Sequence, residues 1–446
     1  MSRIALLGVG PLPIEHPDRT HGTSLRAWQF ARPLAEAGHE VHLLTMRAHN
    51  RLRRDTEIRR GRHGRIMYMS VDEVEHFHND DFVRAWLSEA APEAVVGVNL
   101  FPAMRACQCA GDLPLWADLN GFALGEAQMK AAQTGDDFYL QHFWRMERVV
   151  LLRADHFSTC STPQLHALVG ELSLAGRLSH RTAGCRLIDA VPNARAPEPP
   201  AGSAFHLRGA VVPEHAFILL WSGGYNTWLD GDTMLEAVLL AMDAADSLHY
   251  VSTGGTLDGY DELTYPAFKR AAEASRHAAR FHFLDWIAGS DLPGCYRDAD
   301  AGISVDRDCY EALLGARNRM TDMLQYGVPI VCTEGPEIAR GAGAAGAARL
   351  FPFGDARAGA AAILSLVHDP GVRRAMGEAG RALFARAYTD TIAMQPLVEW
   401  CKQPQRAPDA GNAPPPLEWA EHEEGGRSPR FLRHLVQKIG MLHPER

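Results

Sequence analysis

The stretch WSGGYNTWLDGDTMLEAV, from Trp221 to Val238, joins two kinds of sequence pattern. The apolar run AFILL before it is typical of a buried strand, and from Asp232 onward apolar residues recur at helical spacing. Gly223 and Gly224 occupy the turn between them. Glycines at such a turn often let the backbone approach a phosphate. However, neither G-x-G-x-x-G nor G-x-x-x-x-G-K-[ST] is present, so a phosphate loop and a plain tight turn both remain open.

The same alternation of strand and helix runs along most of the chain. In the first half it predicts strands at 3–9, 40–45, 94–99, 114–120 and 156–160, with helices at 25–38 and 138–152. In the second half it predicts strands at 216–221, 249–255, 281–286, 301–306 and 329–335, with helices at 232–245, 265–278 and 319–327. Such an order is typical of parallel, doubly wound sheets. We therefore predict an α/β fold in which two Rossmann-like domains face a cleft.

Changes in composition mark the expected domain boundaries. The run LIDAVPNARAPEPPAG, rich in proline and alanine, ends the first domain and reads as an interdomain linker. We assign residues 1–200 to the first domain, 201–402 to the second, and 403–446 to a linker and a tail. Ligands of such sheets lie beyond the carboxyl ends of the strands, so the loops there should line the cleft.

The composition of the whole chain is typical of a globular protein. Its 446 residues suggest two domains with additions, and 46% are hydrophobic and 22% charged. A formal net charge of -9 argues against general nucleic-acid binding, which needs a basic face. No secretory signal and no run of about 18 apolar residues is recognisable. The eight cysteines do not resemble a disulfide framework, and Cys107 and Cys109 form a lone C-x-C. We expect a reduced, cytoplasmic protein.

The tail has a composition of its own. Residues 403–426 are rich in proline and acidic groups, as tethers are. Residues 427–446 carry Arg430, Arg433 and Lys438 and place five apolar residues on one helical face: Phe431, Leu432, Leu435, Val436 and Ile439. A basic amphipathic helix of this kind is typical of contact with an anionic membrane or with a partner. A helix that packs back on its own protein is the alternative.

A candidate binding site lies in GARNRMTDMLQYGVPIVCTEG, residues 315–335. Asn318 is a favourable N-cap and Gly327 suits the C-terminal end of a helix. The helix between them would place Arg317 and Arg319 at its positive end, where guanidinium and free N–H groups suit a diphosphate. Asp322, one turn on, would accept hydrogen bonds from a ribose. The alternative is an ordinary exposed ion pair of Arg319 and Asp322.

From residue 3 to about 402 the chain resembles GT-B glycosyltransferases of the broad family 4 group. The segments that carry the resemblance are HGTSLRAWQFARPLAEAGHEVHLLT, ADHFSTCSTPQ, LIDAVPNA, LLWSGG, FHFLDWIAGSDLPGCYRDADAGISV and DMLQYGVPIVCTEG. Their order and spacing make it specific. The resemblance implies a nucleotide-diphospho-sugar donor held by the second domain and an acceptor held by the first. It also implies metal-independent transfer, with retention at the anomeric carbon and with no cofactor besides the donor.

The resemblance further implies a set of donor-binding residues. In the family pattern an acidic residue before G-x-P-V contacts the ribose, and this position holds Asp322. The partner glutamate eight residues earlier falls on Leu314, so Glu311 is a substitute one turn away. The arginine and lysine of the family's first loop are missing from WSGGYNTWLDGD, and we expect Arg317 and Arg319 to supply the cations. The complete donor set is Gly223, Gly224, Trp286, Glu311, Arg317, Asp322, Thr333 and Glu334, with Arg319 as a catalytic residue.

Other carboxylates have more ordinary explanations. Asp230 and Asp232 suit turn and cap positions better than a metal site. The same holds for Asp306 and Asp308, although they mimic a D-x-D motif.

In the first domain the loop His21-Gly22-Thr23 would approach the donor phosphates, with Arg26 one turn into the helix. Asp118 in WADLNG ends a strand at the cleft and is the catalytic candidate of this domain, although a strand-end aspartate as often caps a turn. The remaining polar candidates are Asn120, Glu126 as a second carboxylate, and His16 beside His21 as weaker bases.

We therefore predict a glycosyltransferase that acts on a glycan, a lipid-linked glycan or a protein. One alternative is a nucleotide-sugar 2-epimerase or a phosphorylase on the same fold. Another is a non-catalytic glycosyltransferase-like subunit that binds a partner through its tail, which the missing Arg/Lys pair and Leu314 favour. We also expect peripheral contact with the inner membrane surface, or with a protein, through residues 427–446.

Overall fold

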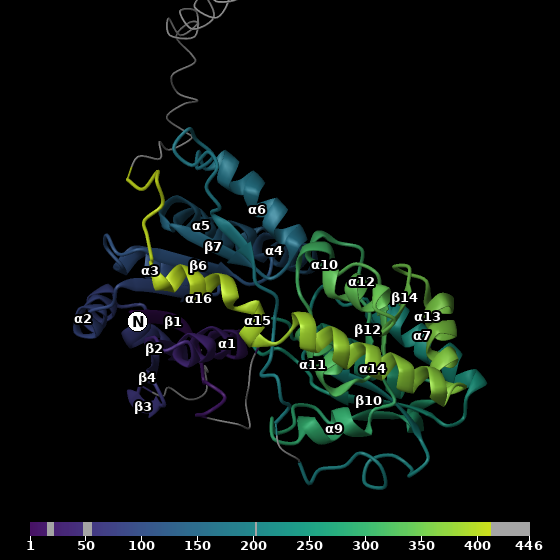
Figure 1. Cartoon of the computed structure of the whole chain (residues 1–446). Helices are drawn as coiled ribbons and strands as arrows, with labels where there is room; N and C mark the ends of the chain where they lie inside the picture. Colours follow the sequence, from purple (N-terminus) through teal and green to yellow (C-terminus); the bar gives the residue numbers. More distant parts are fainter. Residues whose placement is uncertain (16–21, 48–55, 201–202, 412–446) are drawn as a thin grey trace, which may run out of the picture.

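The computed structural model describes residues 1–15, 22–47, 56–200 and 203–411. It contains two α/β domains side by side, each with a central sheet between helices (Figure 1). The predicted fold class is confirmed. Among the described residues, no helix is long and apolar enough to cross a lipid bilayer.

The first domain is built on an eight-stranded sheet with the order β3-β4-β2-β1-β5-β6-β7-β8. Neighbouring strands are parallel except for β3 and β4, which form an antiparallel hairpin. The strands are β1 (Arg3–Gly10), β2 (Glu40–Arg47), β3 (Arg59–His63), β4 (Ile66–Asp72), β5 (Ala94–Val98), β6 (Leu115–Leu119), β7 (His156–Thr159) and β8 (Ile188–Ala190). Each inner strand is buried along almost its whole length, because helices cover both faces of the sheet.

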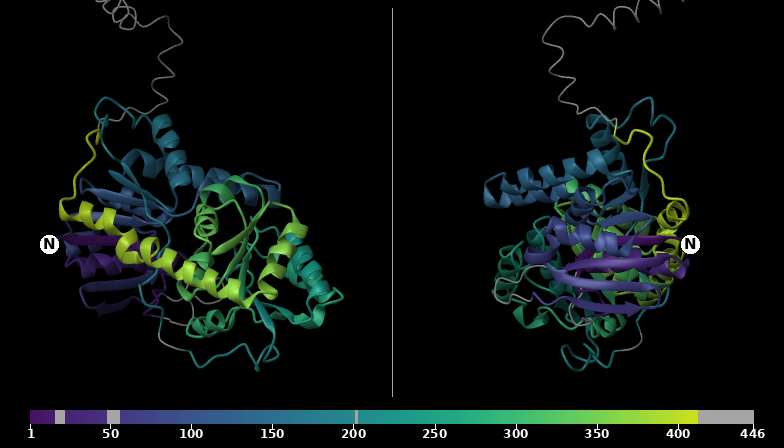
Figure 2. Two further views of the ribbon diagram at one scale, coloured as in Figure 1. Left: turned by 45° about the vertical axis from the view of Figure 1, so that its right-hand side comes forward. Right: turned by 90° about the vertical axis from the view of Figure 1, so that its left-hand side faces the viewer.

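The helices of this domain give the sheet two apolar cores, one on each face. They are α1 (Gly22–Glu36), the π-helical turn η1 (Glu73–Phe77), α2 (Asp80–Ala90), α3 (Leu100–Cys109), α4 (Ala123–Thr134), α5 (Phe138–Arg153) and α6 (Thr162–Leu174). Helices α4 and α5 form a hairpin that projects from the side of the domain (Figure 2, right).

The second domain has a six-stranded, fully parallel sheet with the order β11-β10-β9-β12-β13-β14. Its strands are β9 (Phe217–Ser222), β10 (Leu248–Thr253), β11 (Phe281–Phe283), β12 (Ala301–Ser304), β13 (Ile330–Thr333) and β14 (Ala348–Phe351). Its helices are α7 (Gly231–Ala244), α8 (Thr264–Glu273), the short 3₁₀ turn η2 (Ala278–Arg280), α9 (Leu292–Asp298), α10 (Tyr310–Leu314), α11 (Asn318–Tyr326), α12 (Glu337–Ala344), α13 (Ala356–Val367) and α14 (Pro370–Ala387). Two further apolar cores flank this sheet.

The chain crosses between the domains twice. After α14 it returns to the first domain as α15 (Asp390–Ala393) and α16 (Gln395–Lys402), the yellow helices of Figure 1. Leu397 and Cys401 of α16 are buried in the core of the first sheet, and Ser2 Oγ donates a hydrogen bond to Cys401 O at 3.1 Å. Residues 403–411 continue along the first domain, where Arg177 and Asp409 form a buried ion pair. The sequence analysis assigned residues up to 402 to the second domain. In the structure α16 packs on the first domain instead.

Several elements depart from the sequence-based expectation. The hairpin β3–β4 was not predicted, because RRGRH in β3 is polar and largely exposed. The expected linker includes the short strand β8, which joins the edge of the first sheet. The helix expected at 265–278 ends at Glu273.

Candidate active site between the domains

Two helices begin opposite each other where the domains meet. Helix α1 starts at Gly22 and helix α11 at Asn318. A Cβ atom on Gly22 would lie only 3.0 Å from Asn318 Nδ2. The first N–H groups of a helix lack intrahelical partners and carry partial positive charge. The domain interface thus brings two anion-attracting helix ends together, one from each domain.

Arg319 lies in the first turn of α11, beside the loop that follows β9. Its Nη2 donates a hydrogen bond to Gly224 O at 2.9 Å, and its guanidinium carbon lies 3.5 Å from the centre of the Trp221 ring. Within the part of the chain that the structure describes, no carboxylate forms an ion pair with it. Burial lowers the pKa of Arg319 to about 10, so it stays charged at neutral pH. A half-buried cation without an anionic partner is suited to bind an anionic ligand.

Glycine is required in the loop beside Arg319. Gly223 has a φ of +96°, which favours glycine, and its backbone O accepts a hydrogen bond from Trp221 Nε1 at 2.9 Å. A Cβ atom on Gly254, after β10, would lie 2.1 Å from Gly223 O. Gly223-Gly224 therefore forms a tight turn against a neighbouring loop and presents its backbone to Arg319, and its approach to a phosphate stays a prediction.

Arg317, the second expected cation, is engaged elsewhere. Its Nε lies 3.0 Å from Asp306 Oδ1, and its Nη1 and Nη2 lie 3.0 and 2.6 Å from the two carboxylate oxygens of Glu311. All three side chains are buried. Burial raises the pKa of Glu311, and Arg317 opposes this rise. Contact of Arg317 and Glu311 with the donor stays a prediction, and in this structure the two side chains are paired with each other inside the domain.

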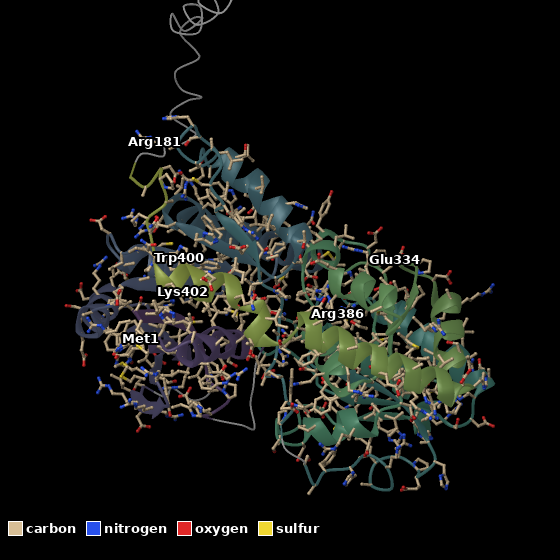
Figure 3. All side chains as sticks on the ribbon, viewed as in Figure 1. Met1, Arg181, Glu334, Arg386, Trp400 and Lys402 are labelled. Carbon is tan, nitrogen blue, oxygen red and sulfur yellow. The ribbon has the colours of Figure 1, made fainter. Side chains whose placement is uncertain are left out.

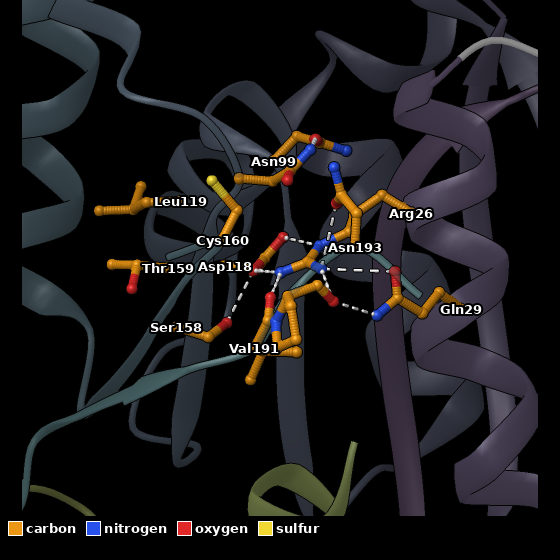
Figure 4. A network of polar contacts seen from close by, with 12 residues as sticks. Arg26, Gln29, Asn99, Asp118, Leu119, Ser158, Thr159, Cys160, Val191 and Asn193 are labelled. Atoms are coloured by element: carbon orange, nitrogen blue, oxygen red, sulfur yellow. Dashed lines mark hydrogen bonds and ion pairs between the residues drawn. The ribbon is translucent and has the colours of Figure 1, made fainter. Parts of the chain in front are cut away.

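Arg26 and Asp118 are committed in the same way in the first domain (Figure 4). Their two hydrogen bonds are 2.7 and 3.0 Å long, and Ser158 Oγ donates to Asp118 Oδ1 at 2.7 Å. Arg26 also donates to the backbone O of Val191 at 2.8 Å. Asp118 is fully buried and Arg26 is 1% exposed. The catalytic role of Asp118 and the donor-side role of Arg26 stay predictions, and in this structure the two buried side chains pair with each other.

Asp322 is half-buried one turn after Arg319 and pairs with the linker. Its oxygens accept hydrogen bonds from Arg195 Nε at 2.7 Å and from Arg195 Nη2 at 3.2 Å. Arg195 Nη2 also donates to Asn318 Oδ1 at 3.2 Å. Contact of Asp322 with a ribose stays a prediction. Arg195 was not among the expected site residues, although it is the single cation in the linker motif VPNARAP.

The other residues expected in the second domain have diverse positions. Thr333 is buried, and its Oγ1 accepts a hydrogen bond from Asp306 N at 3.0 Å. Glu334 directly follows β13 and is exposed (Figure 3), and the indole of Trp286 is half exposed. Asp230 caps α7 by accepting hydrogen bonds from Thr233, which confirms its assignment as a cap residue. Gly327 ends α11 with a φ of +69°, as predicted.

On the first-domain side the loop residues Gly22 and Thr23 are exposed at the start of α1, whereas His16 and His21 lie outside the described residues.

Asn99, which the sequence analysis missed, has a φ of +70° at the carboxyl end of β5. Its Nδ2 donates to Thr23 O at 3.3 Å, and its Oδ1 accepts from Asn120 Nδ2 at 3.3 Å. A non-glycine residue with positive φ is uncommon, and such strain gathers at functional sites.

Glu126 of the first domain has a carboxyl group that contacts the second domain. Its Oε2 accepts a hydrogen bond from Tyr260 OH at 3.3 Å, and Lys130 of the same helix donates to Tyr260 O. Burial raises the pKa of Glu126 to about 7. Helix α4 therefore contacts the loop after β10 and places a carboxyl group that titrates near neutral pH at the domain interface.

The cysteines of the described chain are all free, and Cys107 and Cys109 are buried. Within residues 1–15, 22–47, 56–200 and 203–411, no three His, Cys, Asp or Glu side chains gather as ligands of a metal ion would.

Comparisons with known proteins support the expected family. Residues 216–369 match the family model described as Glycosyl transferases group 1. No curated protein matches the chain significantly. Among solved structures, sucrose-phosphate synthase from Thermosynechococcus elongatus is similar with a TM-score of 0.68 and 16% identity, over 90% of this chain and 99% of that chain. The Anabaena protein HepE in complex with UDP-glucose gives a TM-score of 0.62 and 13% identity, over 90% and 100%.

A third similar structure is WaaG, a glycosyltransferase involved in lipopolysaccharide biosynthesis. It gives a TM-score of 0.57 and 13% identity, over 95% of this chain and 100% of that chain. At these identities the structures show that the fold is shared, and the family model matches residues 216–369. The resemblance drawn from the sequence is confirmed to this extent.

Proposed function

We propose that this chain, a GT-B glycosyltransferase by its fold and by the group 1 family of its second domain, transfers a sugar from a nucleoside-diphosphate donor to an acceptor hydroxyl. The acceptor is a glycan, a lipid-linked glycan or a protein, the anomeric configuration is retained, and no metal is required. The observation that carries the proposal is Arg319, a half-buried cation without a carboxylate partner beside the Gly223-Gly224 turn. The similarity to a fold that holds UDP-glucose supports a nucleotide-sugar donor.

Transfer of the sugar requires that the negative charge on the leaving oxygen be stabilised. When the bond between the anomeric carbon and the β-phosphate oxygen breaks, negative charge develops on that oxygen. Arg319 and the start of α11 would face this charge from the second domain, and the start of α1 at Gly22 from the first. The acceptor oxygen forms the new bond to the anomeric carbon, and its proton passes to the departing diphosphate.

The buried ion pairs hold these groups in place. Arg317, with Asp306 and Glu311, fixes the segment that leads into α11, two residues before Arg319. Arg26 ties the first turns of α1 to β6 and to the linker. Both are therefore positioning residues rather than donor ligands. Such preorganisation matters because the diphosphate must meet groups from two domains at once.

The test is nucleotide binding measured by thermal shift with UDP, GDP, ADP, CDP and dTDP. A ligand at 100 times its dissociation constant stabilises the folded protein by about 2.7 kcal/mol. We expect a shift for the wild type, its loss in Arg319→Gln and its reduction in Asp322→Ala. The matched control is Arg374→Gln, which removes an exposed arginine from α14. An undiminished shift in Arg319→Gln would contradict the placement of the diphosphate.

One observation favours a second candidate function. Because Arg317 is engaged, one of the two cations expected to replace the missing Arg/Lys pair is unavailable. A non-catalytic subunit would tolerate this loss. Nucleotide-sugar turnover discriminates the two functions: release of the nucleoside diphosphate, abolished by Arg319→Gln, supports the enzyme, and binding without release supports the subunit.

A further inference from the structure

The backbone turns sharply just after β11, at Asp285. This residue has a φ of +52°, one of three positive φ values at non-glycine positions within the described residues. Aspartate tolerates this conformation better than most residues, but it still costs energy. Asp285 lies beyond the carboxyl end of a parallel strand, which is where α/β sheets bind ligands. A strained residue in that place indicates a functional constraint.

One carboxylate oxygen of Asp285 is fixed and the other is presented to solvent. Tyr265 OH donates a short hydrogen bond to Oδ1, and Lys269 Nζ lies 3.7 Å from the same oxygen. Within the described residues Oδ2 has no hydrogen-bond partner, and the side chain is 59% exposed. The carboxylate is therefore oriented by the protein while it keeps the capacity to accept hydrogen bonds from a ligand.

An exposed aromatic ring stands next to this carboxylate. Trp286 is 51% exposed, and its Nε1 donates to Thr256 O at 2.9 Å, which anchors the indole to the loop after β10. That loop also contains Gly254, which packs against Gly223. An anchored but exposed indole is suited to stack on a planar ring.

A chain of buried aromatic rings connects Asp285 to Arg319. The guanidinium of Arg319 lies on the Trp221 ring, and the centres of the Trp221 and Tyr225 rings are 4.9 Å apart. Tyr225 is likewise 4.9 Å from Tyr265, whose hydroxyl holds Asp285. The cation proposed for the diphosphate and the carboxylate beside the exposed indole are thus connected through the packed aromatic core of one domain.

We infer that Asp285 and Trp286 form the nucleobase end of the donor site and that they select guanine. The inference rests on the proposed function, because Arg319 must bind the diphosphate of the same ligand. An ionised carboxylate can only accept hydrogen bonds. Guanine offers two adjacent donors, N1–H and N2–H, which match the two oxygens of Asp285 in a charge-assisted pair.

The other bases fit this carboxylate less well. Uracil offers a single donor, N3–H, which lies between the acceptors O2 and O4. The oxygens of a carboxylate repel these two acceptors. Adenine places the acceptor N1 beside its N6 amino group. A site built to pair with donor groups discriminates strongly against ligands that lack them. The preferred donor is therefore a guanosine-diphospho-sugar.

Isothermal titration of the full chain with GDP, UDP and ADP tests the inference. For the wild type we expect GDP to bind at least tenfold more tightly than UDP and ADP. In Asp285→Asn, whose amide both donates and accepts, this preference should fall to less than threefold. Asparagine also tolerates positive φ, so the variant should fold, and its melting temperature without ligand checks this. The matched control, Asp258→Asn in the loop after β10, removes an exposed aspartate and should keep the preference.

The outcomes separate the two hypotheses. Tighter binding of UDP or ADP, or an unchanged GDP preference in Asp285→Asn, overturns the guanine assignment while the proposed function stands. Binding of GDP that survives Arg319→Gln, or no binding of any nucleotide, overturns the proposed function and the guanine assignment with it.

Discussion

Arg26 Nη2 and Asp118 Oδ1 lie 2.7 Å apart in a part of the first domain that solvent does not reach. The pair joins α1 to the end of β6, and Arg26 continues to Val191 O in the linker. Asp118, which the sequence predicted to be catalytic, therefore holds the arginine that links α1 to the segment that leaves the domain.

Removal of one partner of this ion pair should destabilise the first domain. Asp118→Ala leaves the Arg26 guanidinium buried without its counter-ion, for which a loss of about 3–5 kcal/mol in unfolding free energy is expected. Urea denaturation measures this loss. Activity per folded molecule should change little compared with Arg319→Gln. A stable Asp118→Ala variant without turnover would instead restore Asp118 as a catalytic residue.

The carboxyl group of Glu126 should make stability depend on pH. Its pKa is raised from 4.5 to about 7 in the folded protein, so between these values the folded state holds the proton more firmly than the unfolded state. The contribution of Glu126 is thus fully present below pH 4.5, and up to about 3 kcal/mol is lost as the pH rises through 7. In Glu126→Gln this loss should disappear, so the variant should be the more stable protein at pH 8. Urea denaturation at pH 5 and pH 8 measures both values, and equal pH dependence in the two proteins would contradict the raised pKa.

Chelation of metals should leave glycosyl transfer unchanged. The proposed stabilisation of the leaving diphosphate relies on Arg319 and two helix starts, which EDTA does not affect. Nucleoside diphosphate release should proceed at the same rate, within about twofold, in EDTA and in Mg²⁺. A loss in EDTA that Mg²⁺ or Mn²⁺ restores would show that an ion shares this role.

Deletion of residues 427–446 should leave the melting temperature and the turnover of a soluble acceptor unchanged. These residues lie outside the described chain, whereas the preceding segment is held by Arg177 with Asp409 and by Arg406 with Asp155. Those ion pairs remain intact in the shortened protein. A lower melting temperature would show that the tail stabilises the domain, and loss of binding to anionic vesicles alone would assign it to a membrane.

Most of the fold followed from periodicity, because buried parallel strands and amphipathic helices leave local patterns. The strand at 3–9, the helix at 138–152 and the helix that begins near Asn318 all appear within one or two residues of their predicted bounds. The hairpin β3–β4 left no such pattern, since its first strand is polar. Nothing in the sequence of helix α16 itself indicates which domain covers it.

The site was predictable only where local features define it. The glycine turn and the start of α11 were predicted from local sequence, and the structure brings Gly224 and Arg319 into contact there. By contrast, Arg317 and Arg319 look alike in the sequence, and only Asp306 and Glu311, brought in by other elements, commit the first of them. An ion pair between segments that are distant in the sequence produces no local sequence pattern around either residue.

The two crossings between the domains run side by side. Arg195 N donates to Tyr388 O, and Asp390 N donates to Arg195 O, so the outgoing and returning segments are joined like adjacent strands. We expect any relative rotation of the domains to occur about this paired segment. Such a rotation would change the separation of Gly22 and Asn318, which face each other across the interface.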